Sequence, residues 1–296
     1  MPIDETCASG LEYLALATEL LQRARLADPQ AGLWEAADLQ WWWRTPRRSD
    51  AVEQIFWIDD EGPVAAVVLT DWGRAWSCDP IAAPGGRVPL DAVWVRAVEA
   101  IEDARLDAVE VLVRDDNVEV RNLLAGSGFV AAHERSGITW MSADDRPAVA
   151  PIPEGFVLVD RAVGTSGPHP MRRRSGEAVE SRLRQCTLYD PALDLALEAD
   201  DGQVAGYALF WFDPVTKVGL VEPMRVEDAY QRRGLARALL TAGLERLSQR
   251  GARRLKVGYS TDAARALYLG AGFRPTSTSR SYTRRRRVAD SETEAP

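Results

Sequence analysis

The segment Gln231-x-x-Gly234-x-Ala236 carries the residue types that bind a phosphate group. It follows a predicted strand at 218–226 and opens a predicted helix, because leucines recur at helical spacing from Leu235 onward. The N–H groups at a helix start are unpaired and carry partial positive charge, so small residues there let a pyrophosphate approach them. Taken alone, the same segment also fits a strand-to-helix turn whose glycine serves packing.

A second motif follows in the chain, Thr261-x-x-Ala264-x-x-Leu267-Tyr268-x-x-x-Gly272-Phe273. In this order and spacing the two motifs resemble the GNAT superfamily of N-acetyltransferases, whose signature is R/Q-x-x-G-x-G/A at a strand–helix junction followed by N-x-x-A-x-x-L-Y-x-x-x-G-F. The resemblance covers residues 155–287 well and residues 1–145 weakly, as a second copy of the fold.

The resemblance implies acetyl-CoA as co-substrate and no metal. The pyrophosphate would lie at the helix start and the pantetheine amides along the strand before it, where Pro223 predicts that a neighbouring strand separates. Thr261 stands where the family has asparagine, which leaves its cofactor contact open. The residues that the resemblance assigns to acetyl-CoA are Met224, Arg225, Val226, Gln231, Arg232, Arg233, Gly234, Leu235, Ala236, Arg237, Thr261 and Ala264.

Two residues are candidates for proton transfer. Tyr268 matches the family's general acid, and a phenol is protonated at neutral pH and can protonate the departing thiolate. Glu222 is our candidate base, because period-two alternation places it on the same strand face as Met224. Either residue could instead be structural, Tyr268 as a packing ring and Glu222 as a buried acid. No nucleophile elbow or Cys–His pair indicates a covalent route, so we expect direct attack.

An internal repeat appears at a shift of 144 residues, the difference between 261 and 117. In the first copy Leu90 replaces the glycine of the phosphate segment, Pro89 lacks an N–H, and Asp91 would face the anion. Leu124 takes the place of Tyr268, whereas Asn117 keeps the family's asparagine. We therefore predict a degenerate, non-catalytic first copy.

The chain of 296 residues is long enough for two domains. Prolines without an apolar period around 143–153 predict a linker between them. We expect an α/β protein of two tandem GNAT-like domains, each with a mixed, mainly antiparallel sheet flanked by helices. The predicted division is 1–145 for the degenerate domain, 146–153 for the linker, 154–287 for the acetyltransferase domain and 288–296 for a disordered tail.

Three consecutive indoles, Trp41, Trp42 and Trp43, cannot all face one core. At least one should be partly exposed or lie at the boundary between the halves. Packing explains the cluster most simply. The alternative is an aromatic wall that contacts a cationic amine.

The charges and cysteines exclude several classes of function. The net charge of −8 argues against nucleic-acid binding, and two histidines with three scattered cysteines give no zinc cluster. Residues 1–5 have no basic leader, and no run of about 20 apolar residues could cross a membrane. We expect reduced cysteines and a cytoplasmic protein.

The sequence thus predicts an N-acetyltransferase that moves an acetyl group from acetyl-CoA to a primary amine of a small molecule or peptide. The alternative is a non-catalytic acyl-CoA-binding or scaffold protein with the same fold. The sequence leaves the acceptor, the acyl length and the choice between monomer and homodimer open.

Overall fold

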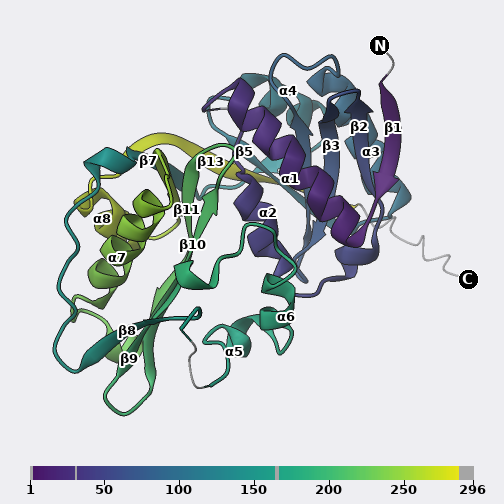
Figure 1. Ribbon diagram of the computed structural model, residues 1–296. Helices are drawn as coiled ribbons and strands as arrows, with labels where there is room; N and C mark the ends of the chain where they lie inside the picture. Colours follow the sequence, from purple (N-terminus) through teal and green to yellow (C-terminus); the bar gives the residue numbers. More distant parts are fainter. Residues whose placement is uncertain (1–2, 31, 164–166, 287–296) are drawn as a thin grey trace, which may run out of the picture.

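The computed structural model describes residues 3–30, 32–163 and 167–286, so the tail predicted at 288–296 lies outside the described residues. Two halves lie side by side, the first purple to blue and the second green to yellow (Figure 1). The first half contains β1 (Asp4–Ala8), α1 (Gly10–Ala27), α2 (Ala36–Trp43), η1 (Arg48–Ala51), β2 (Gln54–Asp59), β3 (Gly62–Asp71), β4 (Trp76–Ala82), α3 (Leu90–Asp103), β5 (Ala108–Arg114), α4 (Val118–Gly126), β6 (Val130–Ala131), β7 (Ser136–Ser142) and η2 (Ala143–Asp145).

The second half repeats this order after the linker. It contains β8 (Phe156–Asp160), α5 (Arg172–Ser175), α6 (Val179–Leu183), η3 (Pro191–Leu193), β9 (Asp194–Ala199), β10 (Val204–Asp213), β11 (Val218–Val226), η4 (Asp228–Tyr230), α7 (Leu235–Gln249), β12 (Arg254–Tyr259), α8 (Asp262–Gly270) and β13 (Arg274–Arg285). Helix α8 starts and ends 144 residues after α4, which matches the shift of the sequence repeat.

The two halves share one sheet of thirteen strands, because each half contributes its last strand to the other. Strand β13 pairs with β5 of the first half, and β7 pairs with β12 of the second half. The two exchanged strands also pair with each other in the middle of the sheet. The order is β1-β2-β3-β4-β5-β13-β7-β12-β11-β10-β9-β8, with β6 beside β13. The linker at 146–153 therefore divides the sequence into two halves, but strands from the two halves pair with each other across this division.

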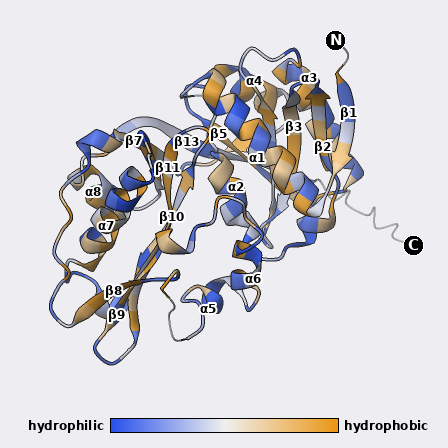
Figure 2. Ribbon diagram, viewed as in Figure 1, coloured by the Kyte–Doolittle hydropathy of each residue, from blue (hydrophilic) through white to orange (hydrophobic). Residues whose placement is uncertain are grey.

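Apolar side chains form three clusters. One lies under α3 in the first half, and another lies between α7 and the sheet of the second half. The third joins the halves, because it includes Leu20 of α1 and Phe56 of β2 together with Leu209 and Trp211 of β10. Figure 2 shows the strands largely orange and the helices alternating between orange and blue, as expected for helices with one buried face.

The linker runs along α7 without regular structure. The Ala150 N–H donates to Thr241 Oγ1 at 2.9 Å, and Arg146 Nε lies 2.7 Å from Glu245 Oε2. None of the described helices is long and apolar enough to cross a membrane.

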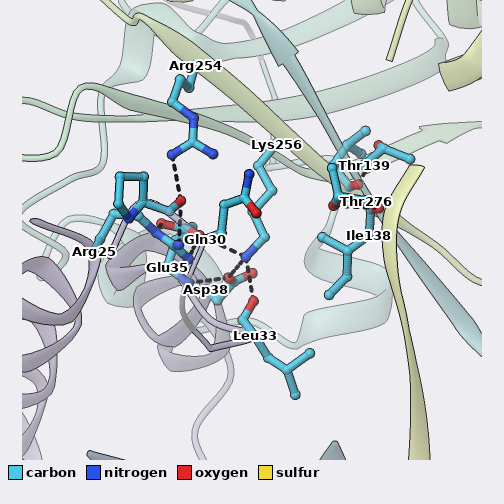
Figure 3. Close-up of polar contacts among 12 residues, drawn as sticks. Arg25, Gln30, Leu33, Glu35, Asp38, Ile138, Thr139, Arg254, Lys256 and Thr276 are labelled. Carbon is cyan, nitrogen blue, oxygen red and sulfur yellow. Dashed lines mark hydrogen bonds and ion pairs between the residues drawn. The ribbon is translucent and has the colours of Figure 1, made fainter. Parts of the chain in front are cut away.

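A buried ionic cluster holds α1 and α2 of the first half against β12 of the second (Figure 3). Lys256 Nζ lies 2.9 Å from Glu35 Oε1 and 3.8 Å from Asp38 Oδ2, and it also donates to the Leu33 carbonyl. Arg25 donates to both oxygens of Glu35, at 2.9 and 2.5 Å. Two bases thus face two acids, and each charge has a partner in the dry interior.

We predict that Lys256→Met destabilises the folded chain by about 3–5 kcal/mol, because it removes the ion pair of the buried Asp38 carboxylate and leaves Glu35 with Arg25 alone. Urea denaturation measures this loss. The matched control is Arg253→Met, which removes an exposed cation beside the same strand and should change the free energy of unfolding by less than about 0.5 kcal/mol. Equal stability of Lys256→Met and the control would contradict the role assigned to the cluster.

Candidate active site

The sheet of the second half opens into a fork between β11 and β12. These parallel strands pair only from Val218 to Leu220, opposite Arg254 to Lys256. Beyond Leu220 the β12-facing backbone groups of β11 have no strand partner in the described sheet. The separation that Pro223 predicts is therefore confirmed, and Met224, Arg225 and Val226 lie on its open side.

A β-bulge in β11 marks the centre of the fork. Phe210 of β10 pairs with Val221 and Ala208 pairs with Met224, so Glu222 and Pro223 together oppose a single residue of β10. The buried Trp211 indole donates to the Glu222 carbonyl oxygen at 2.7 Å. This bond fixes the backbone of the bulge, which turns the next side chains relative to the strand.

The bulge corrects one inference from the sequence. The alternation that would place Glu222 and Met224 on one face is interrupted between them. Met224 packs against the α7 cluster, whereas the Glu222 carboxylate accepts a hydrogen bond from Trp41 of α2. Glu222 therefore faces the first half of the protein.

The surroundings of Glu222 keep its pKa high. Burial, and after it the nearby charge of Asp38, raise the pKa to about 7. The Arg44 guanidinium and the Trp41 indole oppose this shift without cancelling it. A carboxyl group with this pKa can both accept and release a proton near neutrality.

Tyr268 lies on α8, buried, with its ring 6.2 Å from that of Phe273. Burial raises the pKa of the phenol above its ordinary value, and the charge of Glu222 adds to the shift. The structure therefore brings the two proton-transfer candidates close enough to affect each other's ionisation. The phenol stays protonated at neutral pH and remains a proton donor.

Helix α7 begins at the phosphate segment. Its N-cap is Gly234, which has φ +84° and offers no side chain to cap the helix. A Cβ there would meet only Pro153 Cγ at 3.8 Å, so this glycine is required by the left-handed backbone more than by space. Gln231, Arg232, Arg233 and Arg237 are exposed around it, Ala236 is partly exposed, and Leu235 is buried beneath.

The side chains at this start have local partners. Gln231 Nε2 donates to Asp228 Oδ1 at 3.0 Å, and Arg233 donates to the Ala229 carbonyl at 3.3 Å. Thr261 Oγ1 accepts from the Ala264 N–H at 3.2 Å and so caps α8. Asn117 Oδ1 caps α4 in the same way, at 3.1 Å. Threonine and asparagine thus fill the same structural role in the two halves.

The first half keeps the fork but not the phosphate segment. Strands β4 and β5 pair only at Trp76 and Ser77, and a cavity of about 690 Å³ lies beside the opening. Helix α3 starts after Pro89 with Leu90 in its first position, and no glycine cap is present there. The pairing of β3 with β4 runs without a bulge, and Leu124 is fully buried where the second half has Tyr268.

Known proteins resemble the chain in both sequence and fold. Residues 167–273 match the family model described as Acetyltransferase (GNAT) family. A mycothiol acetyltransferase of Clavibacter michiganensis is 28% identical over 216 residues, 67% of each chain, and one of Clavibacter sepedonicus is 25% identical over 248 residues, 76% of this chain and 78% of the relative.

The solved structures agree on the fold. A tandem GNAT protein from the clavulanic acid biosynthesis pathway superposes with a TM-score of 0.68 at 18% identity, over 98% of this chain and 100% of that one. A GCN5-related N-acetyltransferase from Sphaerobacter thermophilus gives 0.62 at 18%, over 97% of each. The chain therefore has the fold of tandem GNAT proteins.

Sequence reasoning missed the contribution of α2 to the surroundings of Glu222. The helix comes from the first half, yet Asp38, Trp41 and Arg44 surround the Glu222 carboxylate. The structure confirms that at least one of the three indoles is partly exposed: Trp42 is, whereas Trp41 and Trp43 are buried in the cluster that joins the halves. The sequence signal that could have indicated this contribution is Asp38, an acid within an apolar, tryptophan-rich segment, where a charge needs a partner.

Proposed function

We propose that the protein transfers an acetyl group from acetyl-CoA to a primary amine by direct attack. The observation that carries this proposal is the pair Glu222 and Tyr268 at the fork of the second half. One carboxyl group has a pKa near neutrality, and one phenol is held protonated beside it. An acetyl transfer to an amine needs one group that accepts a proton and one that donates it.

The chain's own groups suit acetyl-CoA. The exposed start of α7 offers unpaired N–H groups and nearby arginines to a pyrophosphate, and the open edge of β11 from Met224 to Val226 offers backbone partners to the pantetheine amides. We propose this placement for the co-substrate, with Thr261 and Ala264 at the neighbouring helix start. It brings the thioester to the bulge, between Glu222 and Tyr268.

In the proposed reaction Glu222 accepts a proton and Tyr268 donates one. Glu222 takes a proton from the ammonium group of the acceptor, and the amine lone pair then forms a bond to the thioester carbonyl carbon. The tetrahedral intermediate loses the extra proton of its cationic nitrogen to solvent and collapses with cleavage of the C–S bond, while Tyr268 gives its proton to the leaving thiolate. The amide and CoA thiol depart, and the protons exchange with solvent to restore both groups.

The acceptor site would lie between the halves. Asp38 and Trp41 reach Glu222 from the first half, and Arg172 to Arg174 of α5 with Arg225 line an open cavity on the second. The two Clavibacter relatives are named mycothiol acetyltransferases, so we propose that their acceptor be the first tested in an amine panel. All three cysteines are free, which supports our proposal of a cytoplasmic location.

We predict that Tyr268→Phe lowers the turnover rate by about a hundredfold or more, because the thiolate must then leave without a proton donor. The phenyl ring preserves the packing against Phe273, so acetyl-CoA affinity should change little. Turnover is measured as CoA release with an acceptor from the panel. If the mutant binds acetyl-CoA and turns over at the wild-type rate, the assignment of Tyr268 is wrong. If neither protein releases CoA above background with any amine, the protein is an acyl-CoA binder.

A second prediction concerns pH. We expect kcat/KM to rise with pH through about 7, as Glu222 loses its proton and becomes a base. Asp38→Asn removes a negative charge near Glu222, which lowers the pKa of Glu222 and moves the rise to lower pH. Asp228→Asn, an exposed carboxylate at the start of η4, is the control and should leave the midpoint in place. A midpoint that is the same in wild type and Asp38→Asn would contradict this role of Glu222.

A further inference from the structure

A second cavity, of about 350 Å³, opens on the first half and is walled by three indoles. The rings of Trp34 and Trp42 lie 4.8 Å apart and those of Trp42 and Trp72 lie 5.4 Å apart, each pair at 79°. All three indoles line the cavity, and the Arg47 guanidinium lies over the Trp72 ring. A void of this size is within the range of small-molecule sites.

A buried carboxylate lies at the base of this cavity. Asp79 is 5% exposed, and its Oδ1 accepts from the Trp34 indole at 2.9 Å. Its Oδ2 accepts from Ser77 Oγ at 3.1 Å, and that hydroxyl in turn accepts from the Trp72 indole at 3.0 Å. Two of the three indoles are therefore oriented by one negative charge.

The rest of the lining is also acidic. Glu110 and Glu134 line the cavity with Asp79, and Arg74, at 4.0 Å from Glu110, is the one base among the described lining residues. A second base, Arg47, lies against the Trp72 ring, so the acids exceed the bases by one. Serines of the exchanged strands β7 and β13 complete the wall, Ser136, Ser279 and Ser281.

Indoles of this protein already bind cations. The Arg47 guanidinium lies 4.2 Å from the Trp72 ring centre, and that of Arg44 lies 3.4 Å from Trp41. An aromatic wall with a carboxylate behind it is the arrangement that attracts an organic ammonium ion, since the ring faces and the acid attract the same charge. A neutral polyol would gain nothing from the excess of acids.

We propose that the first half binds an organic ammonium ion between Trp34, Trp42, Trp72 and the Asp79 carboxylate. The site lies at the fork of β4 and β5, and Trp34 and Asp79 also border the 690 Å³ cavity on its other side. Because α3 lacks a phosphate-binding start, this site binds its ligand without acetylating it. The proposal does not depend on acetyl transfer by the second half.

Calorimetric titration of the full chain tests the site. The probes are tetramethylammonium and choline, with 3,3-dimethylbutan-1-ol as an uncharged molecule of the same shape as choline. We expect saturable binding of both cations and at least tenfold weaker binding of the alcohol. Asp79→Asn keeps an acceptor for the Trp34 indole but removes the charge, and Trp72→Leu keeps an apolar side chain but removes the ring. Each should weaken choline binding at least tenfold, whereas Asp60→Asn, an exposed carboxylate on the β2–β3 turn, should not.

Indole NMR of the wild type keeps the test independent of variants that fail to fold. Choline should shift the N–H resonances of Trp34 and Trp72, and the alcohol should not. Equal binding of choline and the alcohol would overturn the proposal, as would the absence of saturable cation binding. Choline binding that survives Asp79→Asn but is lost in Glu222→Gln would place the cation in the second half, which also overturns it.

Discussion

The exchange of the last strands constrains everything else in this protein. Each half completes its sheet with a strand from the other, so neither half has a closed set of strand partners without its neighbour. The pairing of β7 with β13 joins the two sheets into one and sets the distance between the two forks. The ionic cluster around Lys256 then fixes α1 and α2 of the first half beside β12, where the fork of the second half begins.

This arrangement lets a half without a phosphate-binding helix start still shape the surroundings of Glu222, the base that we propose. Helix α2 brings Asp38, Trp41 and Arg44 to Glu222, and these groups raise or restrain the pKa of that carboxyl group. In the first half the fork remains open but its centre differs: the strand has no bulge, and a buried leucine stands in place of the tyrosine. What remains there is a pair of cavities on the two sides of Asp79.

The sequence motifs located the helix start, the fork and Tyr268, because these features depend on residues close together in the chain. The shift of 144 residues in the sequence repeat likewise equals the spacing between α4 and α8. The exchanged strands could not be predicted, since the alternation of a strand does not say which neighbour it pairs with. The prediction that Glu222 shares a strand face with Met224 was wrong for a related reason. A bulge interrupts the alternation between them, and its backbone accepts a hydrogen bond from Trp211 on the neighbouring strand, which the local sequence does not reveal.

The most direct test of the account is hydrogen–deuterium exchange of the full chain with and without acetyl-CoA. Backbone amides at 224–238 should become protected, because they are the open strand edge and the helix start that we assign to the co-substrate. Amides at 88–93, the start of α3, should exchange at the same rate in both samples. Protection confined to 88–93, or no protection at 224–238 in a sample saturated with acetyl-CoA, would contradict the central claim.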